Sequence, residues 1–327
     1  MPISPIQFTF APGGDFYPDD GFFENFRREL ERLAPGSRIQ IVDPANWSAD
    51  ELAETSVFMG WPSDAMLDAM PALRWIQLPS AGADRYVGNP RLRDNVALTT
   101  ASGVFGVAGA EHALALLFAV ARGVHFHVAN TLENRWRMPE SSFEIFESTI
   151  AVFGLGSIGS ETAHRLSCLG ARVIGVRRTV TSTVPAYLAE LHPIGAARAV
   201  VERSDAVVLA MPGTPETAGV FSREIIEAMR PGSILVNVGR GTAVDQDALI
   251  DALKTGRVRG AGLDVTDPEP LPPEHPLWSA PNVIIASHSM NVFDRKNERR
   301  FSLLTKNLEL FARDEPLLNL VDHTRGY

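Results

Sequence analysis

The sequence predicts an α/β protein of two domains with doubly wound parallel sheets. Its 327 residues exceed the length that one hydrophobic core usually serves. Strand-like and helix-like segments alternate through the first hundred residues, and later strands are apolar enough to be buried on both faces, as in a parallel sheet. Between the two regions, closely spaced glycines mark a turn from a strand into a helix. The later elements are predicted as strands at 206–211, 234–238, 261–265 and 283–286 and a helix at 295–313.

The first hundred residues predict a small α/β unit. Two of its turns follow the carboxyl ends of predicted strands, where ligands bind in open α/β sheets. Trp61, in the first turn, is as consistent with a packed surface aromatic as with the wall of a substrate site. The backbone N–H groups of Ala81 and Gly82, in the second turn, could bind an anion, and a plain turn is the alternative. The predicted elements are strands at 6–10, 39–42, 57–60 and 73–78 and a helix at 22–33.

A long buried helix is predicted over residues 108–122 and links the two domains. Apolar residues predominate over about four turns, with Glu111 and His112 near the start. These surroundings favour a packing or subunit-contact role for His112 over a ligand-binding role. The stretch 130–147, with several carboxylates, is predicted to be a surface loop.

Gly154, Gly156 and Gly159 have the spacing of a dinucleotide-binding turn. The first glycine permits the tight turn, the second lets a pyrophosphate approach the backbone, and the third lets the helix pack closely on the strand. The first helical residues, Ser157 and Ile158, are expected to present N–H groups and a positive dipole end to the phosphates. The context of an apolar strand and a helix favours this interpretation over an ordinary glycine-rich turn.

The end of the next predicted strand, 172–179, indicates which dinucleotide is bound. An NAD site places Asp or Glu about 20 residues beyond the glycines to bind the ribose 2′-hydroxyl, but Arg177 stands there. Arg177 and Arg178, followed by Thr179, could hold a 2′-phosphate through charge-assisted hydrogen bonds. We therefore expect NADP to be preferred, with NAD possible; a solvated strand end is the alternative.

Composition argues against several classes of function. The 30 Lys and Arg residues against 39 Asp and Glu leave a net charge of −9, and no basic run suggests nucleic acid as a partner. The longest apolar run, 113–121, is too short to span a membrane. The single cysteine, Cys168, excludes an internal disulfide, and a small buried residue is favoured over a reactive thiol. Because residues 1–28 lack a signal-peptide pattern, the expected location is the cytoplasm.

Three unlike side chains follow the carboxyl ends of consecutive predicted strands: Arg240, Glu269 and His288. In a doubly wound sheet these ends lie together beside the dinucleotide. Arginine can bind a substrate carboxylate, and histidine can donate the proton that a developing alkoxide needs. Glu269, if paired with the imidazole, would fix its tautomer, and Asp264 could contact the cofactor. Singly, the three could be a solvated cation, an exposed turn residue and a core histidine; jointly they favour hydride exchange with a 2-oxo acid.

Five motifs resemble the D-isomer-specific 2-hydroxyacid dehydrogenase family, nearly end to end: 154–159, 214–217, 236–241, 262–271 and 287–288. The resemblance implies two Rossmann-like or flavodoxin-like domains, with a cofactor domain, 104–289, inserted into a substrate domain of 1–103 and 290–327. It implies that Arg240 binds substrate, that Glu269 partners His288 as acid/base, and that homodimers form largely through the cofactor domains. It also implies that backbone groups around Ala81 and Gly82 take the substrate carboxylate. The expected cofactor contacts further include Met211, Pro212, Thr217, Val238, Gly239, Arg240, Asp264 and His288, and no metal ligand set is expected.

The resemblance also bears on the reaction. The ending, 320–327, is similar to a branch that contains NADP-preferring glyoxylate and hydroxypyruvate reductases. Formate oxidation is disfavoured because formate dehydrogenases of the family carry glutamine where Glu269 stands. The family commonly has proline before the histidine, whereas Ala286 and Ser287 precede it here. We expect an NAD(P)-dependent enzyme that interconverts 2-oxo acids and D-2-hydroxy acids, mainly as a reductase; the alternative is a nucleotide-sensing regulatory binding protein on the same fold.

Overall fold

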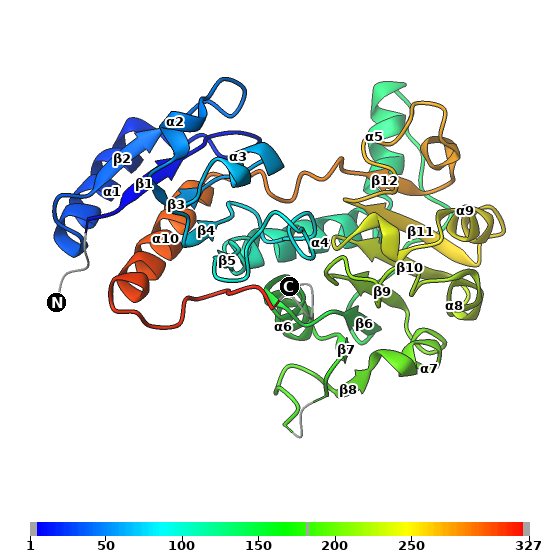
Figure 1. Ribbon diagram of the computed structural model, residues 1–327. Coiled ribbons are helices and arrows are strands. Elements are labelled where there is room, and N and C mark those ends of the chain that lie inside the picture. Colours follow the sequence, from blue (N-terminus) through cyan, green and yellow to red (C-terminus); the bar gives the residue numbers. More distant parts are fainter. Residues whose placement is uncertain (1–4, 181–182, 323–327) are drawn as a thin grey trace. The chain divides into compact units, whose positions relative to one another are not determined.

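Two compact units make up the chain in the computed structural model, which describes residues 5–180 and 183–322 (Figure 1). Unit 1 comprises the chain up to residue 104 and the segment from residue 293 onward, and unit 2 comprises residues 105–292. Unit 2 is therefore inserted between the two segments of unit 1. Each unit contains a parallel sheet flanked by helices, which confirms the predicted α/β fold.

The sheet of unit 1 has five parallel strands in the order β2-β1-β3-β4-β5. This is a flavodoxin-like order, in which the direction of winding reverses between β1 and β3. The loops after these two strands therefore lie where such sheets bind ligands. The strands are β1 (Gln7–Phe10), β2 (Arg38–Ile41), β3 (Thr55–Met59), β4 (Trp75–Gln77) and β5 (Ala97–Thr99).

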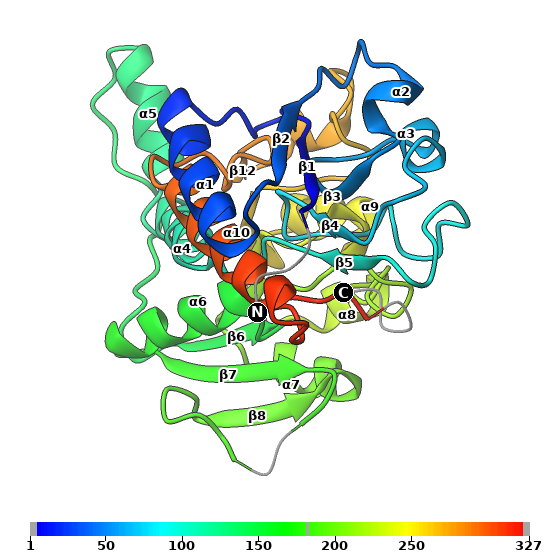
Figure 2. The same ribbon diagram turned by 60° about the vertical axis from the view of Figure 1, so that its left-hand side comes forward.

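Helices α1 (Asp20–Leu33) and α10 (Lys296–Ala312) lie side by side in unit 1 (Figure 2). The side chain of Asp19 caps α1 by accepting a hydrogen bond from the N–H of Phe22, at 2.8 Å. Aromatic rings of α1, α10 and β1 then pack edge to face, which stabilises the contact beyond the area buried. The rings are Phe8, Phe10, Phe22, Phe26 and Phe301. Unit 1 also contains the short helices α2 (Ala49–Leu52) and α3 (Asp64–Asp68).

The sheet of unit 2 has seven parallel strands in the order β12-β11-β10-β9-β6-β7-β8. Counted from β6, this is the Rossmann order 3-2-1-4-5-6 with a further strand at one edge. The winding reverses between β6 and β9, so their carboxyl ends are the expected dinucleotide position. The strands are β6 (Thr149–Phe153), β7 (Arg172–Arg177), β8 (Glu190–Pro193), β9 (Ala206–Leu209), β10 (Ser233–Asn237), β11 (Val258–Leu263) and β12 (Val283–Ile285).

Helix α4 (Gly106–Ala121) is the core helix of unit 2. It packs so closely on β11 that a Cβ on Gly262 would lie 2.8 Å from the Cβ of Leu116.

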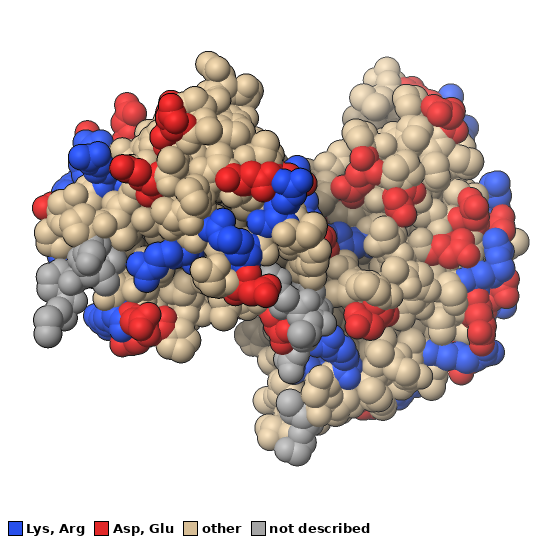
Figure 3. Space-filling model, viewed as in Figure 1, with Lys and Arg blue, Asp and Glu red and all other residues tan. Residues whose placement is uncertain are grey.

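Acidic and basic side chains alternate over the outer helices α8 and α9 (Figure 3), where Arg223 pairs with Asp251. The remaining elements are α5 (Val124–Leu132), α6 (Ser157–Cys168), α7 (Ala197–Val201), α8 (Arg223–Ala228) and α9 (Gln246–Lys254), with 3-10 turns at Ile194–Ala196, Gly241–Ala243 and Pro276–Ser279.

Local predictions fail at three places in unit 2. The predicted loop over 130–147 misses the end of α5, which starts after Gly123 (φ 64°) at a bend of 68° from α4. The edge strand β8 was not predicted, because it is short and carries polar residues. The prediction of a buried Cys168 is wrong: α6 buries the face that carries residues 159, 162, 163 and 166, and Cys168 lies off that face, exposed.

Among the described residues, no single helix is long and apolar enough to cross a membrane. Only α4 and α5 together reach that length and composition, and they are bent by 68° where they meet.

Candidate active site

The turn after β6 carries the three predicted glycines, and packing explains two of them. A Cβ on Gly154, which has φ +88°, would lie 2.6 Å from the carbonyl oxygen of Ala210, and a Cβ on Gly159 would lie 1.8 Å from that of Gly154. Gly156 differs, since a Cβ there would meet nothing within 4 Å and its φ of −76° suits any residue. Helix α6 starts beside this open space without a side-chain cap. The open space and the free helix start fit a dinucleotide pyrophosphate.

Ser157 and Ile158 form the first turn of α6. The side chain of Ile158 packs on α4, because a Cβ on Gly109 would lie 2.9 Å from its Cγ1. Its side chain therefore serves helix packing, and the predicted cofactor contact would fall to its backbone N–H.

Strand β7 ends at Arg177, which is half-buried, and the exposed residues Arg178 and Thr179 follow. The pKa of Glu216, in the loop after β9, is lowered chiefly by a hydrogen bond from Thr214 and to a smaller extent by the charge of Arg178. The turn after β7 and the loop after β9 therefore lie near each other at the carboxyl edge of the sheet.

The loops after β9 and β10 touch at this edge. Thr217 Oγ1 donates a hydrogen bond to the carbonyl oxygen of Pro212, at 2.7 Å, so the threonine folds its own loop. A Cβ on Gly239 would lie 2.6 Å from the carbonyl oxygen of Met211. Met211 and Val238 are both buried at this contact. The structure thus brings these predicted cofactor residues together, while their contact with a cofactor stays a prediction.

Glu269 and His288 form the central pair of the site. Nδ1 of His288 lies 2.8 Å from Oε2 of Glu269, and the two side chains are 40% and 38% exposed. The other carboxylate oxygen, Oε1, accepts the N–H of Thr266 at 3.1 Å, which fixes the orientation of the carboxylate. Because the carboxylate accepts the proton on Nδ1, Nε2 is the nitrogen that can exchange a proton with a substrate.

Arg240 follows β10 in a turn shaped by Asn237. The buried amide of Asn237 accepts the N–H of Gly239 at 3.0 Å and donates to the carbonyl oxygen of Arg240 at 2.9 Å. Arg240 itself is half-buried and donates from Nη1 to the carbonyl oxygen of Gly239. The role of Asn237 was not predicted, and its signal in the sequence is a polar residue that closes an apolar strand.

The turns that carry Arg240 and Glu269 are in direct contact. A Cβ on Gly241 would lie 1.9 Å from the carbonyl oxygen of Thr266, so only glycine fits there. Since Thr266 also binds Glu269, the structure places all three predicted chemical groups on neighbouring turns at one edge of the sheet.

Asp264 lies beneath the segment that carries His288. Its carboxylate is fully buried and accepts the N–H of Ser289 at 2.8 Å and that of Met290 at 3.4 Å. Its carbonyl oxygen accepts the N–H of His288 at 2.5 Å. The side chain thus serves the chain's own backbone, and the cofactor contact predicted for Asp264 stays a prediction.

In unit 1, Trp61 braces the turn that contains Ala81 and Gly82. Trp61 Nε1 donates to Ser80 Oγ at 3.1 Å, and Ser80 Oγ donates to the carbonyl oxygen of Gly82 at 2.9 Å. The half-buried tryptophan ring packs against the core of unit 1, whereas Ala81 is exposed. Trp61 is therefore a packed aromatic, and its role as a substrate wall stays a prediction.

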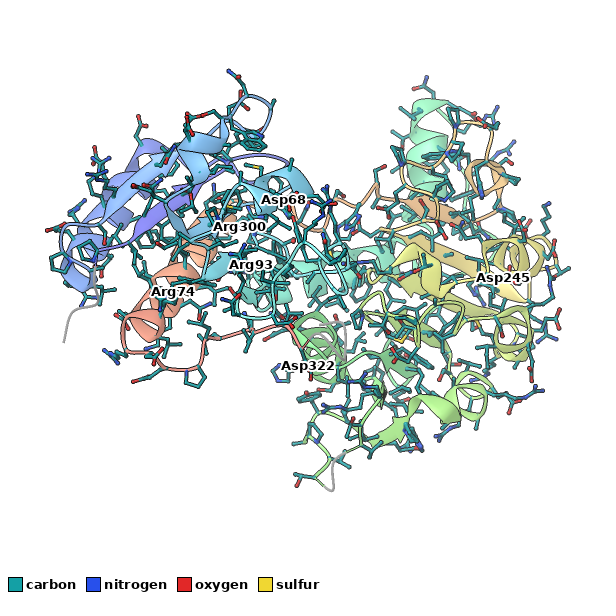
Figure 4. All side chains as sticks on the ribbon, in the orientation of Figure 1. Asp68, Arg74, Arg93, Asp245, Arg300 and Asp322 are labelled. Carbon is teal, nitrogen blue, oxygen red and sulfur yellow. The ribbon has the colours of Figure 1, made fainter. Side chains whose placement is uncertain are left out.

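Arg300 of α10 supports the same turn from the interior of unit 1 (Figure 4). It is 1% exposed, and burial lowers its pKa while Asp15 opposes that shift. Its Nε donates to the carbonyl oxygen of Pro79 at 2.9 Å, and Nη2 donates to both carboxylate oxygens of Asp15. Lys296 also binds this carboxylate, at 2.9 Å. This network, which was not predicted, ties α10 to the loops after β1 and β4.

Comparison with known proteins gives the family. The family described as D-isomer specific 2-hydroxyacid dehydrogenase, NAD binding domain, matches residues 114–289. A glyoxylate reductase of Korarchaeum cryptofilum is 33% identical over 270 residues, which cover 80% of this chain and 80% of that protein.

Two solved structures share the fold of the whole chain. A D-isomer specific 2-hydroxyacid dehydrogenase from Xanthobacter autotrophicus Py2, in complex with NADPH and MES, is 27% identical with a TM-score of 0.83, and covers 99% of this chain and 100% of that one. An NADPH-dependent glyoxylate/hydroxypyruvate reductase from Sinorhizobium meliloti, in complex with NADP and sulfate, is 25% identical with a TM-score of 0.82. The alignment covers 98% of this chain and 100% of that one. These complexes agree with the prediction of NADP, with NAD possible. The chain belongs to the D-isomer specific 2-hydroxyacid dehydrogenase family and is an NAD(P)-dependent oxidoreductase.

Proposed function

We propose that the protein reduces 2-oxo acids to D-2-hydroxy acids with NADPH, and that NADH serves less well. The observation that carries the proposal is the His288 to Glu269 contact at 2.8 Å, on the edge of the unit 2 sheet where the glycine turn also lies. An acid/base pair on the same sheet edge as a dinucleotide-binding turn fits hydride exchange with a carbonyl.

In this proposal unit 2, 105–292, binds the dinucleotide. The start of α6 beside Gly156 takes the pyrophosphate, and Arg177 and Arg178 at the end of β7 take the 2′-phosphate, with Thr179 next to them. Guanidinium groups suit this role because they present several donors to one phosphate. Support comes from the solved relatives that hold NADPH and NADP.

His288 is the proposed proton donor to the substrate carbonyl oxygen. When bound, the dinucleotide supplies the hydride. Glu269 accepts the proton on Nδ1 and thereby orients the imidazole, so that Nε2–H of the ring can donate to the developing alkoxide. Arg240 binds the substrate carboxylate and polarises the carbonyl. This division of roles makes the three side chains act in one step.

In unit 1, the proposal concerns the turn that contains Ala81 and Gly82. Its backbone N–H groups at Ala81 and Gly82 take the substrate carboxylate, in a turn fixed by Ser80 and Arg300. The relatives named as glyoxylate and hydroxypyruvate reductases support small 2-oxo acids as substrates. The ending 320–327 also resembles such reductases, but its residues 323–327 lie outside the described residues.

A homodimer in the cytoplasm is proposed as the working form. Large apolar side chains are exposed on α5 and the segment after it, which is a surface that a second copy of the chain would cover. They are Val124, Val128, Leu132, Trp136, Met138 and Phe146. The single cysteine is compatible with a reducing compartment.

Steady-state rates with pyruvate, glyoxylate, hydroxypyruvate and a bulkier 2-oxo acid, each with NADPH and NADH, test the proposal. We expect turnover of at least one small acid, a D-configured product where the product is chiral, and a higher kcat/KM with NADPH. Turnover of none of them together with tight NADPH binding would instead support the regulatory binding protein. Tighter NADH than NADPH binding would reject the role of Arg177.

A further inference from the structure

The backbone that carries His288 adopts an unusual conformation. Ser287 and His288 have φ of 52° and 54°, in the left-handed region that residues other than glycine rarely adopt. Such a conformation persists only where its surroundings hold it. Here Asp264 holds it, with its carbonyl oxygen on the His288 N–H and its carboxylate on the next two N–H groups. A shift of the Asp264 carboxylate would therefore move the imidazole.

The buried carboxylate of Asp264 faces the imidazole of His112, on α4. Nε2 of His112 lies 3.1 Å from Oδ1 of Asp264, close enough for an ion pair. This nitrogen is shielded from solvent and, among the described residues, it has no aligned hydrogen-bond partner. A carboxylate without solvent is costly unless a donor or a positive charge lies beside it. The imidazole of His112 is the polar group that α4 places beside this carboxylate.

Helix α4, which carries His112, is held in place by close packing on two neighbouring elements. It packs on β11, the strand that ends just before Asp264, at the close approach of Leu116 to Gly262. The same helix packs on α6 through Gly109 and Ile158. These close contacts of α4 with β11 and with α6 fix the position of His112.

We infer that His112 is a positioning residue for the acid/base His288. His112 orients the carboxylate of Asp264, and Asp264 holds the left-handed segment so that the imidazole keeps its contact with Glu269. The packing or subunit-contact role expected from the sequence does not include this contact. The inference rests on the proposed function of His288.

The closing experiment compares three substitutions at one position with a neighbouring control. His112→Asn and His112→Gln carry the same amide, but only glutamine is long enough to place an N–H near Asp264. His112→Ala removes the donor altogether. Glu111→Gln, the exposed preceding residue of α4, is the matched control. The measurements are kcat, KM, the Kd of NADPH, the solvent deuterium isotope effect on kcat, and the proton NMR signal of His288 Nδ1–H, assigned by its loss in His288→Gln.

We expect His112→Ala and His112→Asn to lower kcat about 10- to 100-fold, as misplacement of a catalytic group by about 1 Å does. KM and the Kd of NADPH should stay within about threefold, and the isotope effect should rise because proton transfer slows. The Nδ1–H signal should shift or broaden. His112→Gln should regain most of kcat, and Glu111→Gln should match the wild type.

An unchanged Nδ1–H signal and a kcat within about twofold in folded His112→Ala and His112→Asn would overturn the inference. Equal losses in kcat and in NADPH binding would also overturn it, because they indicate a general structural role. If the wild type reduces none of the 2-oxo acids, the proposed function fails, whereas the NMR signal still decides whether His112 positions His288.

Discussion

In the glycine turn after β6, one glycine is required for folding and another is proposed to bind the dinucleotide, so substitutions can separate stability from NADPH binding. In Gly159→Ala the new Cβ would start 1.8 Å from the carbonyl oxygen of Gly154, whereas real Cβ atoms essentially never approach within 3.0 Å. The new Cβ is bonded to the backbone and the carbonyl oxygen is part of it, so neither can rotate away. Strand β6 and helix α6 must therefore move apart. We expect a loss of about 3 kcal/mol in the free energy of unfolding and a Tm lower by about 6 to 12 °C for a unit of this size.

Gly156→Ala is the matched variant, with the opposite expectation. Its Cβ would enter open space at an ordinary backbone conformation, so the Tm should change by no more than about 3 °C. The methyl group would occupy the space proposed for the pyrophosphate, and the Kd of NADPH should rise at least about tenfold, or about 1.4 kcal/mol. Thermal unfolding and NADPH fluorescence titration give the two quantities. A Gly156→Ala protein that binds NADPH as tightly as the wild type, or that loses as much Tm as Gly159→Ala, would refute the reasoning.

Three further predictions concern other parts of the chain. Arg203 and then His192 hold the pKa of Glu190 well below its ordinary range, so the stability that this carboxylate contributes is present above about pH 4.5 and is lost as the pH falls. Urea unfolding should therefore show a gap between wild type and Glu190→Gln that shrinks from about pH 6 to about pH 3, and a constant gap would contradict this. Arg300→Met removes a buried cation from its carboxylate and carbonyl partners and should cost about 3 kcal/mol of unfolding free energy; a cost below about 1 kcal/mol would show that the network is dispensable. Arg177→Ser should raise the KM of NADPH about tenfold while the KM of NADH stays within about threefold, and equal changes with both cofactors would remove Arg177 from the 2′-phosphate site.

Most of the fold was predictable because its buried elements carry local patterns. Apolar strands buried on both faces, helices ended by glycine and the glycine turn all show in neighbouring residues. The elements that were not predicted lack such a pattern. Helix α5 exposes much of its apolar surface and β8 is a polar edge strand, so neither has the periodicity of a buried element.

The placement of the proposed chemical residues at one edge of the sheet was also predictable, whereas the contacts that support these residues were not. Glu269 and His288 each follow a strand, and parallel strands bring such residues to one edge. The contact between His112 and Asp264 joins residues far apart in the sequence. A half-buried histidine in an apolar helix suggests only a packing role when the helix is considered alone. Contacts of this kind depend on how α4 lies on the sheet, which no short pattern encodes.

The acid/base role of His288 is the central claim, and one measurement tests it most directly. The rate of NADPH oxidation by the best 2-oxo acid substrate is compared between the wild type and His288→Gln, with the Kd of NADPH measured on the same samples. The account predicts a kcat lower by about 10²- to 10⁴-fold with a Kd within about threefold. A kcat equal to that of the wild type would contradict it.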